Sequence, residues 1–170
     1  IAERAGAVGI TIHLREDRRH IQDRDLSLIR QVVRGKLNLE MAPVEEMRGI
    51  ALDTRPDQVT LVPERREEIT TEGGLDVSGQ MDRLAAIIDP VQAAKILVSL
   101  FIDPESHQIE AAHRLGADYI ELNTAAYSEA RNSEAVGREI SALKKAADQA
   151  HALGLGVHAG HGLTFLNVDP

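Results

Sequence analysis

Histidines and glutamates at the ends of apolar runs are the residues of this chain best suited to proton transfer. His13 ends a β-branched run, and imidazole is the side chain that titrates nearest neutral pH. Glu40 lies between two apolar residues, where burial raises a carboxyl pKa toward the range that an acid/base catalyst needs. Glu121 invites the same argument less strongly, because its segment is more polar. The alternative, non-catalytic interpretations are a surface histidine bonded to a backbone carbonyl and a glutamate paired with an arginine.

A second histidine cluster lies near the end of the chain. His158 and His161 bracket Ala159 and Gly160, and Gly162 follows, so the backbone there can approach a ligand closely while a histidine points at it. A metal site is an alternative, but no Asp-x-Asp, His-x-His or His-Glu-x-x-His pattern supports one. The pattern therefore favours acid/base chemistry without a metal.

Arginine after the first apolar run is placed to hold an anion. Arg15 lies two residues past His13, and a guanidinium forks onto phosphate or carboxylate. His20 could add a donor, although a solvated loop with internal ion pairs also explains this charged stretch. The segment 70–74, which begins with Thr70, could bind phosphate through hydroxyls and amides or be a plain turn.

Two kinds of covalent catalysis lack a candidate. The sequence has no cysteine, which removes thiolate nucleophiles and cysteine-based metal sites. Each of its four lysines precedes an expected strand or lies within an expected helix, so none can form a Schiff base at a strand end. They are Lys36, Lys95, Lys144 and Lys145. The chemistry must be acid/base and electrostatic.

Alternating strands and helices must position these side chains. We expect strands at 8–13, 37–41, 57–63, 96–102, 118–123 and 156–162. We expect helices at 24–33, 43–53, 80–88, 104–115 and 133–153. Asp23, Pro43 and Pro104 are predicted to begin helices, and Pro90 to break or restart one. Residues 1–5 look like the last turn of a helix that Gly6 ends, and the long segment 64–79 is a predicted lid.

Strand–helix alternation with short turns predicts a parallel sheet with right-handed crossovers. Polar residues follow several strands, which favours a TIM (β/α)8 barrel over an open doubly wound sheet. These residues are His13, Glu40, Glu64, Asp103, Glu121 and His161. About six of eight strand–helix units are present, so we expect residues 1–170 to form a single barrel domain truncated at both ends.

The amino-acid composition limits the kinds of partner that we expect this chain to bind. The net charge is -8, and 43% of residues are hydrophobic but only 2% aromatic, which predicts an aliphatic core. Dispersed basic residues among more numerous acids argue against nucleic acid as a partner. No apolar run approaches the length of a membrane span, so a cytoplasmic location is the default expectation.

Several of these motifs together closely resemble the pyridoxine 5′-phosphate synthase family of vitamin B6 biosynthesis. The resemblance covers essentially the whole chain, and its motifs occur in order with compatible spacing. They are 9–21, 37–41, 61–66, 70–77, 98–103 and 159–163.

The resemblance implies a TIM barrel transferase that condenses 3-amino-2-oxopropyl phosphate with 1-deoxy-D-xylulose 5-phosphate, releases phosphate and water, and uses no cofactor. It implies that His13 and Glu40 are proton acceptors, His161 the proton donor and Glu121 a stabiliser of the transition state. It also implies that Arg15, His20 and Thr70 contact the deoxyxylulose phosphate and that Gly162 contacts the amino-ketone phosphate. A ring-like homo-octamer is the expected assembly.

The family pattern also has parts that these residues lack. Its first strand, with an Asn and an Asp-His cluster, and its last strand, with a Gly-His phosphate site, have no counterpart here, so we expect these residues alone to be inactive. Two alternatives stay open: another phosphate-binding (β/α)8 isomerase or epimerase, and a non-catalytic barrel fragment that serves as an assembly surface. A requirement for two substrates with phosphate release separates the synthase from the isomerase.

Overall fold

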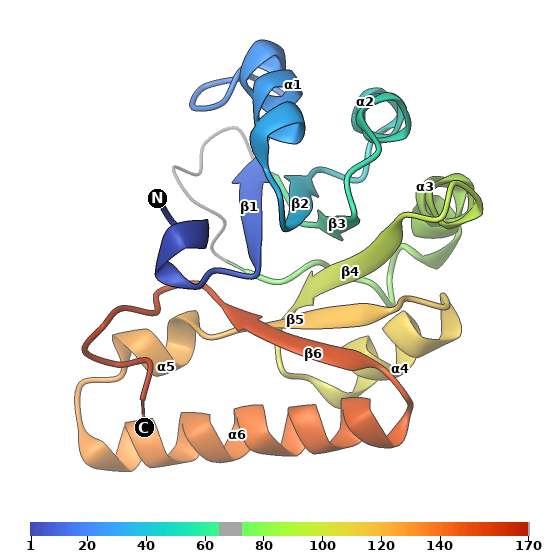
Figure 1. Cartoon of the computed structure of the whole chain (residues 1–170). Coiled ribbons are helices and arrows are strands. Elements are labelled where there is room, and N and C mark those ends of the chain that lie inside the picture. The colour runs from blue at the N-terminus through green and yellow to red at the C-terminus, as the bar shows by residue number, and fades with distance from the viewer. Residues whose placement is uncertain (65–72, 170) are drawn as a thin grey trace.

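The computed structural model describes residues 1–64 and 73–169 and contains one sheet of six parallel strands. The strands pair in chain order, and the sheet curves into an open half-barrel with β1 and β6 at its two edges (Figure 1). They are β1 (Gly9–His13), β2 (Lys36–Met41), β3 (Gln58–Leu61), β4 (Leu97–Ile102), β5 (Tyr119–Asn123) and β6 (Gly156–Gly160). The prediction of an α/β fold with parallel strands that form part of a barrel is confirmed.

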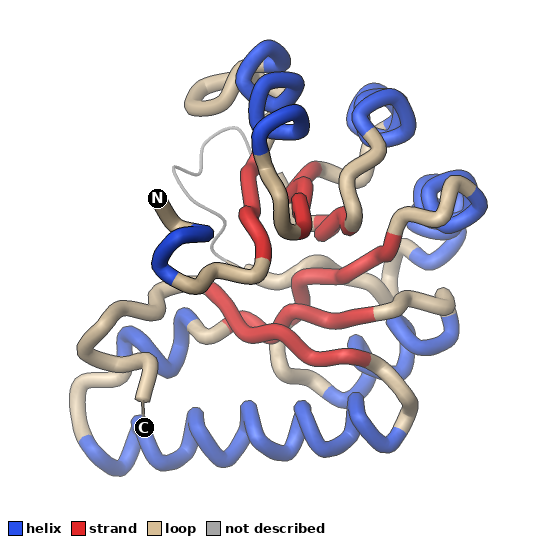
Figure 2. Tube along the Cα trace, in the orientation of Figure 1, coloured by secondary structure: helices blue, strands red, loops and turns tan. Residues whose placement is uncertain are grey.

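The main helices follow the strands and cover the outer, convex face of the sheet (Figure 2). They are α1 (Asp23–Val32), α2 (Glu45–Thr54), α3 (Met81–Ala93), α4 (Ser106–Arg114) and α6 (Ser133–Ala152). A short helix, α5 (Ala125–Glu129), follows β5 and has no counterpart among the predicted elements. The turn η1 (Glu3–Ala5) is a 3-10 helix that ends, as predicted, at Gly6 with φ +103°.

Side-chain alternation along the strands separates an apolar outer face from a polar inner face. Leu39, Val59, Leu100 and Ile120 point to the helices and are fully buried. Intervening residues of the same strands carry the polar groups of the inner face. The core therefore lies between the sheet and the helices, and the inner face is left for chemistry.

Carboxylates fix the register at the amino-terminal ends of the strands. Asp57, just before β3, accepts a hydrogen bond from the amide of Leu37 in β2 at 2.9 Å. Asp118, just before β5, does the same for the amide of Val98 in β4 at 2.8 Å. Because register decides which side chains share a level, these contacts help to align the strand ends.

The prediction that Pro90 breaks a helix is wrong. Helix α3 runs through Pro90 to Ala93, although proline removes the amide that would bond the carbonyl of Ala86. The guanidinium of Arg48 on α2 donates to that carbonyl instead, at 3.0 Å. A neighbouring helix therefore replaces the hydrogen bond that proline removes.

Three predicted helix starts are also displaced. Asp23 is the first residue of α1 rather than its cap, and Gln22 forms a capping box with Asp25. The helices that Pro43 and Pro104 were expected to open begin two residues later, at Glu45 and Ser106. The residue before each of these helices has an extended backbone. Helix α1 therefore begins one residue earlier than predicted, and α2 and α4 begin two residues later.

The predicted lid divides into two parts. Residues 65–72, which include Thr70, lie outside the described residues. Residues 73–79 pack onto the sheet, because the amide of Leu75 donates to the carbonyl of Phe101 at 2.8 Å and Val77 is fully buried. Within the described ranges, no helix is both long and apolar enough to cross a membrane.

Candidate active site

His13 joins two carboxylates at the ends of β1, β2 and β3. It is the last residue of β1 and pairs in register with Glu40 of β2. Its Nδ1 lies 3.9 Å from Glu40 Oε2, and its Nε2 lies 2.9 Å from Glu64 Oε1. Strand order and register thus bring together three residues separated by up to 51 positions in the chain.

Glu40 is held in an environment that favours its neutral form. Its side chain is only 16% exposed, and burial is the main cause that raises its pKa above the usual value. His13 and His161 oppose this shift, while the carboxylate of Glu121 adds to it. The prediction that a carboxyl between apolar neighbours on a strand has a raised pKa agrees with this arrangement.

Glu121 and His161 form the second pair, at the ends of β5 and β6. Glu121 Oε1 lies 3.6 Å from His161 Nδ1, slightly longer than a hydrogen bond but close enough for an ion pair. Interaction with Glu121 is the main cause that raises the pKa of His161, and the charge of Glu40 adds to it. The His161 ring also rests on Phe101, with ring centroids 4.1 Å apart.

The position of Glu121 depends on Gly160. A Cβ at Gly160 would come within 2.2 Å of Glu121 Oε1, so any larger residue would displace this carboxylate. Gly162 has φ +75°, and a Cβ there would lie 2.0 Å from Ser128 Oγ on α5. These two glycines let the backbone at the end of β6 pass close to Glu121 and Ser128, and the predicted approach to a ligand stays a prediction.

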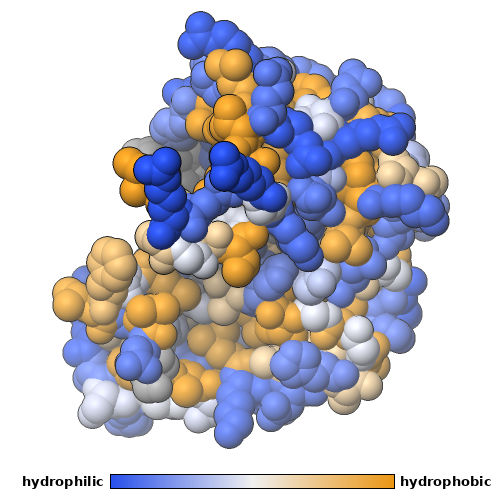
Figure 3. All heavy atoms as spheres, viewed as in Figure 1, coloured by the Kyte–Doolittle hydropathy of each residue, from blue (hydrophilic) through white to orange (hydrophobic). Residues whose placement is uncertain are grey.

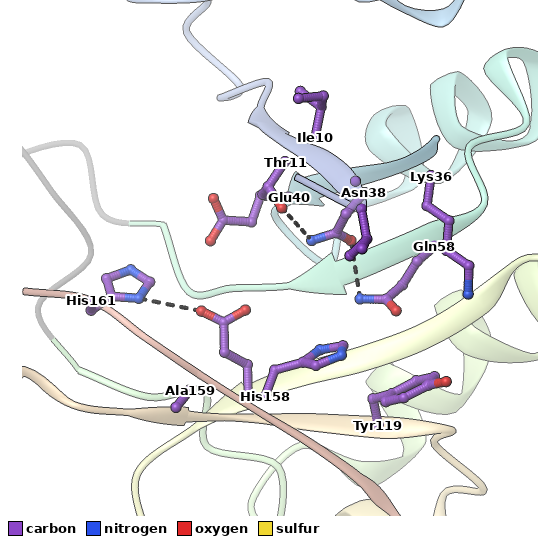
Figure 4. A pocket seen from close by; sticks show the side chains of 13 residues that line it. Ile10, Thr11, Lys36, Asn38, Glu40, Gln58, Tyr119, His158, Ala159 and His161 are labelled. Carbon is purple, nitrogen blue, oxygen red and sulfur yellow. Dashed lines mark hydrogen bonds and ion pairs between the residues drawn. The ribbon is translucent and has the colours of Figure 1, made fainter. Parts of the chain in front are cut away.

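Glu40, Glu121 and His161 border one hollow of about 760 Å³ on the inner face of the sheet, and His13 contacts it through Glu40. Figure 4 shows Glu40 and His161 on opposite sides of it, with the dashed line from His161 ending at Glu121. The surface view in Figure 3 shows mostly hydrophilic side chains, with apolar ones gathered around a depression on this face. The polar lining residues of the hollow are Thr11, Lys36, Asn38, Glu40, Gln58, Tyr119, Glu121, His158 and His161.

Hydrogen-bonded side chains from β1, β2 and β3 line another part of the hollow. Asn38 donates to Thr11 Oγ1 at 3.3 Å and accepts from Thr60 at 3.1 Å and from Gln58 at 3.3 Å. Tyr119 and His158 stack with centroids 4.8 Å apart. His158 pairs in register with Glu121, but its ring stacks on Tyr119 rather than on His161.

Three residues were predicted to contact the deoxyxylulose phosphate, namely Arg15, His20 and Thr70. Arg15 is buried, with 4% of its surface exposed, and its charge helps to lower the pKa of Glu64. His20 is exposed, and no hydrogen bond or ion pair joins it to the site within residues 1–64 and 73–169. Thr70 lies outside the described residues. The structure brings together His13, Glu40, Glu121 and His161, with Arg15 close enough for its charge to act on Glu64.

Sequence reasoning missed the contact that Glu64 makes. Glu64 was recognised only as one of several polar residues at strand ends, with no partner assigned. The usable signal was that the ends of adjacent parallel strands meet at one edge of the sheet. In the part of the chain that the structure describes, no group of three or more His, Asp or Glu side chains is arranged to hold a metal ion.

Comparison with known proteins decides the family. The family described as "Pyridoxal phosphate biosynthesis protein PdxJ" matches residues 1–170. The chain is also 60% identical to the pyridoxine 5′-phosphate synthase of Gloeothece citriformis, over 100% of this chain and 71% of that protein. The chain belongs to the pyridoxine 5′-phosphate synthase family.

Other members of the synthase family agree. The synthase of a Synechococcus strain is 61% identical and that of Syntrophotalea carbinolica 57%, each over 100% of this chain and 71% of the relative. Among solved structures, a chain of the Amycolatopsis orientalis BexX/CysO complex has a TM-score of 0.49 and 13% identity, covering 95% of this chain and 72% of that one. That likeness is too slight to support an argument.

Proposed function

We propose that this synthase-family chain condenses 3-amino-2-oxopropyl phosphate with 1-deoxy-D-xylulose 5-phosphate to give pyridoxine 5′-phosphate, phosphate and water. The observation that carries the proposal is the placing of Glu40 and His161 across one hollow. Burial raises the pKa of the Glu40 carboxyl above its usual value, and Glu121 raises the pKa of His161, which favours the protonated ring. The site thus offers a carboxyl and an imidazole, both with raised pKa values, on opposite sides of one hollow (Figure 4).

This combination suits a reaction of many proton transfers. Imine formation, dehydration, phosphate loss and ring closure each move protons, and several acids and bases serve such a sequence better than one nucleophile. His13 and Glu40 would accept protons, and His161 would return them. Glu121, close to His161, would stabilise positive charge that develops beside it.

The substrate contacts rest on the family resemblance. Arg15, His20 and Thr70 are the proposed partners of the deoxyxylulose phosphate, and Gly162 is the proposed partner of the amino-ketone phosphate. Phosphate binding by Arg15 is supported by its place two residues beyond β1, where its charge acts on Glu64 after β3. A homo-octamer is proposed on the resemblance as well, whereas the single truncated domain, the cytoplasmic location and the absence of a nucleic-acid partner remain predictions from the sequence.

A two-substrate assay tests the function. The full-length protein is incubated with both phosphorylated substrates or with either alone, and pyridoxine 5′-phosphate and free phosphate are quantified. We expect one phosphate per product, and neither when one substrate is left out. Conversion of a single sugar phosphate without phosphate release would instead identify an isomerase or epimerase, and a protein without turnover would fit the assembly-surface alternative.

A further inference from the structure

Glu64 uses both of its carboxylate oxygens to hold the site together. It follows β3, and its side chain is 6% exposed. Oε1 lies 2.9 Å from His13 Nε2, and Oε2 accepts the backbone amide of Glu16 at 3.1 Å. The residue therefore links the end of β3 to the loop after β1 through two different partners.

The charge of Glu64 decides which nitrogen of His13 carries the proton. Burial would raise the pKa of Glu64, but hydrogen bonds from His13 and from the Glu16 amide, with the charge of Arg15, hold it below the usual value. An ionised carboxylate only accepts hydrogen bonds, so Nε2 of His13 must donate. The neutral ring then carries its lone pair on Nδ1, the nitrogen that lies 3.9 Å from Glu40.

We propose that Glu64 is a positioning residue that fixes His13 in the Nε2–H tautomer and so presents Nδ1 toward Glu40 as the base. The proposal rests on the proposed function, because it deepens the role of His13 in that reaction. Glu64 is not among the residues that line the hollow, and its hydrogen bond reaches the site through the imidazole of His13. Orientation of a catalytic histidine by a buried carboxylate on its other nitrogen is a general device of acid/base sites.

The exposed pair of Glu105 and His107 gives a contrast within the same chain. Its atoms are 3.4 Å apart, and both side chains are more than half exposed. Such a pair is screened by water and has little power to fix a ring. Glu105→Gln is therefore a matched control that removes the same charge from a glutamate–histidine pair outside the site.

Glu64→Gln is the decisive variant because it keeps the shape of the side chain. The Glu16 amide can only donate, so the single carboxamide oxygen turns toward it. The amide nitrogen then faces His13 Nε2, which must accept, and the proton moves to Nδ1. We expect the nitrogen-15 NMR signal of His13 Nδ1 to change from pyridine-type to pyrrole-type.

Activity of the full-length protein is the second measurement. With Nδ1 protonated, His13 can no longer accept a proton at the nitrogen that faces Glu40. We therefore expect kcat to fall by about 100-fold or more while KM changes by less than about threefold. Glu105→Gln should leave both the His13 signal and kcat unchanged. A pyrrole-type Nδ1 in the unsubstituted protein, an unchanged tautomer in Glu64→Gln, or a kcat unaffected by the switch would each overturn the proposal.

The two readouts separate this inference from the proposed function. The NMR signal requires no turnover and is assigned by its loss in His13→Asn. A protein that makes no product but shows the tautomer switch would contradict the proposed function while supporting the assignment of Nδ1. Formation of product without the tautomer switch would support the proposed function and contradict the assignment of Nδ1 as the base.

Discussion

Glu121 lies 3.6 Å from Nδ1 of His161 and raises the pKa of that imidazole, which favours its protonated form. Replacement of Glu121 by Gln removes the carboxylate whose interaction with the imidazole is the main cause of the raised pKa of His161. We predict that Glu121→Gln lowers this pKa, measured by NMR titration of the imidazole, and lowers kcat by about 100-fold. The exposed His107 ring serves as the internal reference, and an unchanged His161 midpoint would refute the pairing.

The same pair links stability to pH. A histidine whose folded pKa lies above its usual value of 6.5 stabilises the fold fully below that value, and the contribution is lost as pH rises through the folded pKa. The deficit of Glu121→Gln should therefore be largest in acid and shrink toward alkaline pH. Thermal unfolding across this range measures it.

Local pattern was enough to find the catalytic candidates but not their partners. His13 and Glu40 stand out because a polar residue at the end of an apolar strand is unusual in its own neighbourhood. The contact of His13 with Glu64 joins residues 51 positions apart, and no local pattern specifies it. The burial of Arg15 was hidden for the same reason, since the surrounding charges suggested a solvated loop.

Helix α3 continues through Pro90 because Arg48 of α2 bonds the carbonyl of Ala86. We predict that Arg48→Ala lowers the free energy of unfolding by about 1 kcal/mol in the presence of Pro90. In the Pro90→Ala background the restored backbone amide can bond that carbonyl, so the same change should have less effect. A double-mutant cycle by denaturant unfolding measures the coupling.

An exposed arginine provides the control for this cycle. Arg138 pairs with Glu134 four residues earlier on α6, and both are largely exposed. Its replacement by Ala should change the free energy of unfolding by no more than about 0.5 kcal/mol in either background. Equal losses for Arg48→Ala with and without Pro90 would show that the guanidinium does not replace the missing bond.

Periodicity predicted the elements better than their ends. All six strands and the main helices are present near their expected positions, because burial of one face imposes a spacing that the sequence shows. Helix starts at Asp23, Pro43 and Pro104 were misplaced because several nearby residues could begin the helix. The prediction at Pro90 was wrong because the hydrogen bond that replaces the missing one comes from a different helix, α2.

Across the whole chain, the parallel order of six strands places the four catalytic candidates on one inner face. They come from β1, β2, β5 and the residue after β6, and Glu40 is influenced by charges from both pairs. Alternation of strands and helices was sufficient to predict this topology. The balance of charge across the hollow was not predictable, because it depends on distances between strands.

Glu40 carries the central claim because it is the buried carboxyl whose pKa the fold raises. A raised carboxyl pKa means that stability falls as pH rises from the usual value of 4.5 through the folded pKa. Glu40→Gln lacks this penalty, so it should fold and be at least as stable as the unsubstituted protein at neutral pH. Thermal unfolding checks this before any rate is compared.

The most direct test is the rate at which full-length Glu40→Gln forms pyridoxine 5′-phosphate from the two phosphorylated substrates. Loss of a positioned general base predicts a kcat about 100- to 10,000-fold lower than that of the unsubstituted protein. A folded variant with an unchanged rate would contradict the account of this site.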